Sequence, residues 1–198
     1  MSDETGYPLI EAPRSGKRVR YVETAADTDG EYARFEMWLA PPEESHGPMQ
    51  HVHPEQDEYL EVRDGTLGVW HDGTTCRLSS GESVTVPAGD PHRFWNAGEG
   101  RLHLVGEVRP ALLTEPFMYV TYGVGQDYLA TPSGMPLNPL RLAPILERYD
   151  DLLYLAFLPI WLQRLGIRVL TPVGRLLGYT AEYPEYVPDE RADCVPSN

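Results

Sequence analysis

The sequence predicts an all-β domain, either a sandwich or a small barrel, followed by a short α-helical extension. From residue 18 to about residue 122, runs of alternating apolar and polar residues, such as 33–39, are separated by turn-forming residues. Two of these runs end in Asp-Gly, at 64–65 and 72–73, a strong signal for a tight turn between strands. The 18 glycines and 19 prolines of the 198-residue chain also fit a fold with many turns.

Five segments are expected along the chain. They are an N-terminal arm (1–17), the β-barrel (18–122), a linker loop (123–139), the helical extension (140–180) and an acidic tail (181–198). Prolines break helices outside the first turn. Pro144, Pro159 and Pro172 should therefore divide the extension into two or three short helices, each with one wet edge and one buried face.

The apolar residues of the extension need a covered surface. The longest uncharged run of the extension, 152–163, has twelve residues, whereas a membrane span needs about 20, so no transmembrane segment is expected. We expect the extension to pack on the barrel or on a second subunit, and a homodimer is the expected assembly. The alternative is a peripheral membrane contact through residues 152–178, because the run 152–162 is apolar on all sides.

The charge balance excludes one class of partner. The chain has 30 acidic and 16 basic residues, a net charge of −14, and would be repelled by phosphate backbones, so no nucleic-acid partner is expected. Such acidity is typical either of an adaptation to a salt-rich cytoplasm, as in a halophile, or of an ordinary acidic cytosolic protein. The acidic N-terminus lacks an apolar core, so a cytoplasmic location is expected. Whether Cys76 and Cys194 pair is left open.

Two histidines one residue apart suggest a metal site. In a strand, His51 and His53 point to the same side and make a natural pair of ligands. Pro54 interrupts the strand, so a new strand can begin near Glu58 with that carboxylate on the same face as Leu60. A carboxylate on an apolar inward face needs compensation, which a metal would supply.

A fourth ligand follows about forty residues later. The segment 81–96 contains a tight turn at 87–91 that delivers His92 onto the next strand, with Phe94 and Asn96 on the same face. His92 would reach the site from a neighbouring strand.

These two blocks resemble the paired motifs of the cupin superfamily. The first motif is matched by His51, His53, Glu58 and Gly65, and the second by Gly81, Pro87, Gly89, His92 and Asn96. One position differs, because the glycine that precedes the first motif in the family falls on Ser45. That glycine shapes a turn and binds nothing.

The resemblance implies a double-stranded β-helix, or jelly roll, with a divalent transition metal in its mouth. The ligands would be His51, His53, Glu58 and His92, and the metal would be Fe, Mn, Ni, Cu, Co or Zn. The absence of a thiolate ligand argues against a closed structural zinc site. With one carboxylate, the ligand shell of a divalent ion stays net positive and favours an anionic oxygen donor.

Four further residues are candidates for the pocket around this site. Gln56 would point at the metal or its water, or else belong to a turn. Phe94 would line the pocket or belong to the core. The other two are Asn96 and His103, and His103 alternates with Leu102 and Leu104.

The predicted function is that of a mononuclear-metal enzyme acting on a small, oxygen-rich, anionic compound. Cupins include dioxygenases, decarboxylases and isomerases, and a dioxygenase is the preferred interpretation. The alternative is a non-catalytic binder that holds a small metabolite in the barrel, because fold does not fix function. The sequence shows no helix-turn-helix pattern and no basic surface that would support a DNA-binding regulator.

Overall fold

The computed structural model describes residues 7–188. The strands are β1 (Ile10–Ala12), β2 (Lys17–Glu23), β3 (Ala33–Leu39), β4 (His51–Val52), β5 (Asp57–Asp64), β6 (Thr66–His71), β7 (Thr74–Ser79), β8 (Ser83–Val86), β9 (His92–Asn96), β10 (Leu102–Arg109) and β11 (Tyr154–Leu155). The helices are α1 (Thr114–Asp127), α2 (Pro139–Arg148), α3 (Ile160–Leu176) and a short 3-10 turn, η1 (Pro13–Ser15).

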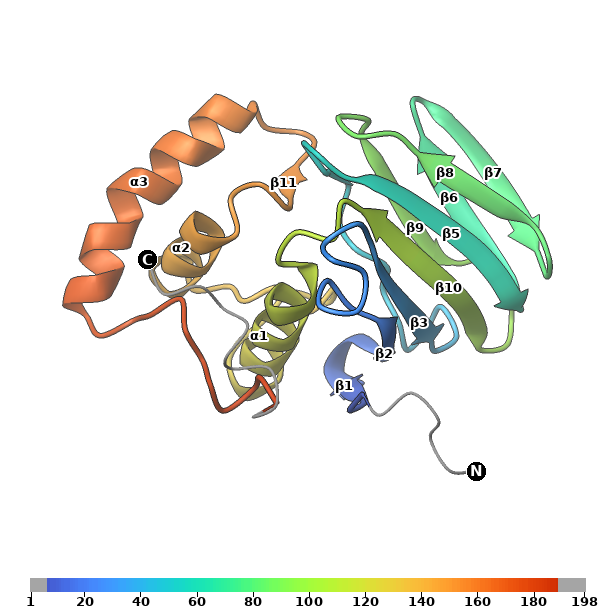
Figure 1. Cartoon of the computed structure of the whole chain (residues 1–198), viewed down its shortest axis with the longest axis horizontal. Coiled ribbons are helices and arrows are strands. Elements are labelled where there is room, and N and C mark those ends of the chain that lie inside the picture. The colour runs from blue at the N-terminus through green and yellow to red at the C-terminus, as the bar shows by residue number, and fades with distance from the viewer. Residues whose placement is uncertain (1–6, 189–198) are drawn as a thin grey trace.

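The strands form two antiparallel sheets that enclose an apolar core. The six-stranded sheet has the order β1-β2-β3-β10-β5-β8, and the five-stranded sheet has the order β11-β4-β9-β6-β7. The alternation predicted for 33–39 is present, with Ala33, Phe35, Met37 and Leu39 at most 3% exposed. This arrangement confirms the jelly-roll fold expected from the sequence (Figure 1).

The N-terminal arm is more ordered than the sequence suggested. Ile10–Ala12 pairs antiparallel with residues 17–19 of β2 and so extends the six-stranded sheet. Ile10 and Ala12 point inward and are buried, which gives the strand an apolar anchor.

Helix α1 occupies residues for which strand and loop were expected. Its β-branched and aromatic residues, with Gly123 and Gly125, favour strand or loop by local propensity. Phe117, Val120 and Val124 nevertheless recur at helical spacing and are buried together, so tertiary packing decides the conformation. A Cβ on Gly125 would lie 2.2 Å from the carbonyl oxygen of Gly134, so this glycine permits close packing of α1 against the 131–135 turn.

The extension folds into two helices and packs on the barrel. Ile145, Tyr149 and Leu152 form a second apolar cluster with α1. Residues 154–155 pair with β4 and add β11 to the five-stranded sheet. Figure 1 shows α1 between the sheets and α2, with α3 on the far side of α2.

The prolines act differently from the expectation. Pro159 precedes α3, whereas Pro144 and Pro172 lie inside helices and do not divide them. Residues 183 and 186 of the expected tail pack against the second cluster. Cys194 lies outside the described residues.

Helix α3 does not have the expected arrangement of a polar, solvent-exposed edge and a buried apolar face. Its apolar residues Trp161, Leu165 and Val169 are 68%, 51% and 61% exposed, and within residues 7–188 no segment covers them. Within the same residues, no helix has the length and hydropathy required to cross a membrane.

Replacement of Ile145 by alanine should test the contribution of the second cluster. Ile145 is fully buried, so Ile145→Ala should lower the free energy of unfolding by roughly 2–5 kcal/mol through lost burial and a residual cavity. Leu165→Ala on the exposed face of α3 is the matched control and should change it by less than about 0.5 kcal/mol. Urea denaturation measures both. Equal losses for the two variants would contradict the packing described here.

Candidate metal centre

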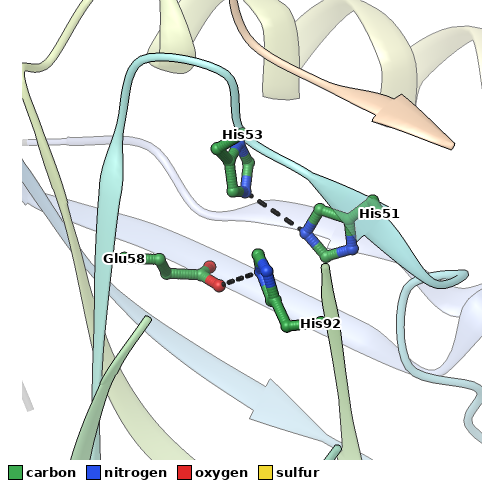
Figure 2. A group of neighbouring side chains, drawn as sticks. All are labelled: His51, His53, Glu58 and His92. Carbon is green, nitrogen blue, oxygen red and sulfur yellow. Dashed lines mark hydrogen bonds and ion pairs between the residues drawn. The ribbon is translucent and has the colours of Figure 1, made fainter. Parts of the chain in front are cut away.

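Four side chains from three strands and one loop meet at the mouth of the barrel. His51 lies on β4 and is paired in register with His92 on β9, while Glu58 lies near the start of β5. His53 follows β4 directly. Each of the four can offer one donor atom such that all these atoms lie within 4.8 Å of one another (Figure 2). The sequence prediction of these four residues as a group is therefore matched by their positions.

The orientation of each imidazole is fixed by a backbone carbonyl. The Nδ1 atoms of His51, His53 and His92 lie 2.8, 2.5 and 3.0 Å from the carbonyl oxygens of Met49, Leu152 and Asp90. Because a carbonyl only accepts hydrogen bonds, each Nδ1 carries the hydrogen. The three Nε2 atoms are thus available to the centre of the cluster.

Burial keeps two of the imidazoles neutral. Desolvation lowers the pKa of His51 to about 3, and also lowers the pKa of His53. Neutral imidazole is the form that binds a metal.

His92 and Glu58 form a buried pair. Their Nε2 and Oε2 atoms are 2.8 Å apart. Burial favours the neutral form of each, but the mutual hydrogen bond and charge outweigh it. The pKa of Glu58 is lowered to about 2 and that of His92 is raised. A metal bound by these atoms would displace the proton that they share.

The donor set fits a first-row transition metal. Three nitrogens and one carboxylate oxygen match the preference of such ions. Four protein ligands also leave positions open for water, dioxygen or another oxygen donor in a five- or six-coordinate ion.

Family comparison agrees with this geometry. Residues 36–106, which contain all four residues of the cluster, match the family model described as a cupin domain. The chain therefore contains a cupin domain over these residues.

The chain is similar to several named proteins. A probable oxidoreductase, virH, from Hypocrea virens is 29% identical over 154 residues, covering 71% of this chain and 68% of that protein. The tetracenomycin polyketide synthase protein TcmJ from Streptomyces glaucescens is 34% identical over 61 residues, covering 31% of this chain and 41% of that protein. Among solved structures, an RmlC-like cupin from Shewanella frigidimarina is 20% identical, with a TM-score of 0.48 over 59% of this chain and 93% of that one.

A predominantly apolar cavity adjoins this candidate metal-binding cluster. It has a volume of about 120 Å³, and His51, His53 and Glu58 form part of its wall. The rest of the wall comes from both sheets, α1, the 131–135 turn and the 152–155 segment, with apolar side chains such as Phe35, Phe117, Met118 and Leu153. The extension thus completes the cavity.

Two of the four predicted pocket residues line this cavity, Gln56 and Phe94. Gln56 is 1% exposed, and its Nε2 donates to the carbonyl oxygens of Pro110 and Ala111 and to Thr114 Oγ1. Its Oε1 has no hydrogen-bond partner among the described residues. Gln56 thus lies in the loop before β5, with a buried side chain that lines the cavity.

Asn96 and His103, the other two predicted pocket residues, lie elsewhere. The Asn96 amide donates to the carbonyl oxygens of Leu39, Ala40 and Gly100, so it ties strand ends together. His103 stacks on Trp38 and lies 3.2 Å from Glu36, because β10 turns alternate residues away from the core.

Sequence reasoning did not single out Lys17 as a cavity residue, although it lines the wall. The signal was present, because Lys17 shares the inward face of β2 with Val19 and Tyr21. The Leu152 carbonyl, by contrast, contacts His53 although the two residues are 99 positions apart in the sequence. A main-chain carbonyl is present at every residue, so residue types could not predict this contact.

Loss of two ligands should abolish metal binding. We expect about one ion per chain in the purified protein and none in the double variant His51→Ala/His92→Ala, measured by plasma mass spectrometry. Glu58→Gln should weaken binding less than loss of either histidine, because the amide oxygen still donates without its charge. His103→Ala, outside the cluster, is the matched control and should keep the metal. Stoichiometric metal in the double variant would refute the assignment.

Proposed function

We propose that this cupin is a mononuclear-metal oxidoreductase, and specifically a dioxygenase, that acts on a small phenolic or enolisable compound. The observation that carries this proposal is the convergence of His51, His53, Glu58 and His92 in one cluster. All of these residues except His92 line an apolar cavity. A bound divalent ion would supply Lewis acidity and a place for oxygen donors. A dioxygenase transfers both atoms of dioxygen to its substrate, so no further reductant is required.

The relatives support the reaction class and the kind of substrate. The relative that aligns over 68% of its own length is named a probable oxidoreductase. A shorter match is named a polyketide synthase protein, and polyketides are rich in phenolic and keto oxygens. The apolar wall, with only a few polar groups, suits a compact ring that bears such oxygens.

Gln56 would position the substrate. Three hydrogen bonds hold its Nε2 at the start of α1, so the amide cannot rotate without losing them. This leaves Oε1 as a fixed, buried acceptor on a residue of the cavity wall. A hydroxyl hydrogen of the substrate is the group that such an acceptor would bind, since an unsatisfied buried oxygen is costly.

The second candidate is a non-catalytic binder that holds the same kind of compound. The same cavity and cluster favour it, because recognition does not require turnover. Oxygen consumption separates the two candidates.

Metal-loaded protein should consume oxygen with at least one member of a panel of phenols and keto acids. An oxygen electrode gives the rate, and isotope-labelled dioxygen followed by mass spectrometry shows whether both atoms enter the product. The His51→Ala/His92→Ala variant is the control and should be inactive. Tight binding of a panel member with no oxygen uptake under any metal would favour the binder.

Gln56→Ala should separate positioning from metal binding. Metal content should stay at the wild-type level, while kcat/KM for the active substrate falls about tenfold or more, because one hydrogen bond in a buried site is lost. An O-methyl ether of that substrate should lose far less. If Gln56→Ala released more metal than Glu58→Gln, Gln56 would replace Glu58 as the fourth ligand.

A further inference from the structure

A buried cation lies in the cavity wall. Lys17, the chain's single lysine, begins β2 and is 3% exposed. Its inward position follows from the alternation of β2, in which Lys17, Val19 and Tyr21 are buried and Arg18 is exposed. Lys17 lines the same cavity as the metal-binding cluster.

The contacts of Lys17 leave its charge uncompensated by protein anions. Nζ donates to the carbonyl oxygen of Ser133 at 2.9 Å and lies 5.7 Å from the centroid of the Tyr122 ring. No acidic group of residues 7–188 raises the pKa of Lys17, and burial alone lowers it to about 8. The ammonium form therefore persists at neutral pH without a carboxylate partner.

A buried ammonium group without an anionic partner destabilises the fold unless a ligand compensates its charge. Burial of an unpaired ammonium is strongly unfavourable, and lysines are almost never fully buried without a partner. A carbonyl oxygen accepts one of the three ammonium hydrogens, and an aromatic face adds weaker attraction. Two donors and most of the charge remain to be satisfied at the edge of the cavity.

We propose that Lys17 binds an oxyanion on the cavity's ligand, so that the ligand is an apolar ring compound carrying a carboxylate or an ionised enol. The inference rests on the proposed function for the identity of the site but concerns a residue that does not bind the metal. Lys17 is the only lysine or arginine among the described residues that line the cavity, so one negative group on the ligand would compensate its charge. The cavity volume of about 120 Å³ suits a single aromatic ring.

Benzoate and its neutral analogue benzamide test this assignment. Binding is measured by calorimetry at fixed ionic strength on protein treated with EDTA, so that a carboxylate cannot bind through a metal. The wild type should bind benzoate more tightly than benzamide. Lys17→Met should lower benzoate affinity at least about tenfold and change benzamide affinity less than about twofold.

A matched control and a second variant keep the test decisive. Arg63→Met removes the same charge from an exposed ion pair with Glu61 and should leave both affinities unchanged. Lys17→Gln retains a donor for the Ser133 carbonyl and should lose benzoate affinity as Lys17→Met does. If Lys17→Met does not fold, Lys17→Gln decides.

Stability gives an independent measurement. Lys17→Met should melt at a higher temperature than the wild type without ligand, since an uncompensated buried charge is removed. Benzoate should raise the melting temperature of the wild type alone. A lower melting temperature for both variants, with unchanged benzoate binding, would show that Lys17 only holds the 131–135 turn and would overturn the proposal. Equal losses of benzoate and benzamide affinity would also overturn it. So would the absence of saturable benzoate binding to the wild type.

The two proposals can fail separately. Protein that binds no metal and consumes no oxygen, but shows benzoate binding that depends on Lys17, would refute the proposed function and retain this inference. Metal-dependent oxygen uptake that is unaffected by Lys17→Met and Lys17→Gln, with unchanged benzoate binding, would support the proposed function and refute the inference about Lys17.

Discussion

A buried imidazole needs an acceptor for its second nitrogen, and this requirement organises the site. Each ligand histidine meets it with a main-chain carbonyl, at Met49, Leu152 and Asp90. Two of these carbonyls lie two residues before their histidine, so local loop geometry supplies them. The third comes from the distant C-terminal extension. The barrel alone therefore does not complete the surroundings of the cluster.

The segment that supplies the Leu152 carbonyl also forms part of the cavity wall, together with α1. Helix α1 and residues 152–155 line the cavity, and their other side packs into the second apolar cluster. In such surroundings, charges and hydrogen bonds act in a low effective dielectric and are stronger than at the surface. Glu58, Lys17 and the unpaired Oε1 of Gln56 are all placed where each can discriminate strongly between ligands.

The parts of the site that depend on residue type and short spacing could be predicted from the sequence. His51, His53, Glu58 and His92 fall in two compact blocks, and strand alternation identified the barrel. Helix α1 was missed because its packing, and not its local propensity, determines its conformation. Strand alternation made Asn96 and His103 candidates for the pocket without fixing their direction. Main-chain acceptors hold Asn96, and the outward face of β10 carries His103. Lys17 was missed because the barrel was expected to begin at residue 18, whereas β2 begins at Lys17 and its alternation turns this residue inward.

The hydrogen bond from His53 to Leu152 would link metal binding at the candidate centre to the position of the extension. Strand β11 lies three positions or fewer from Leu152, and Gln163 of α3 clamps it by accepting from the amide of Leu155 and donating to its carbonyl. Hydrogen bonds and a short stretch of backbone thus connect α3 through β11 to His53. Linkage is reciprocal. Metal binding should hold the extension against the barrel. A partner on the exposed face of α3 whose affinity changes when metal binds would change the affinity for metal by the same free energy.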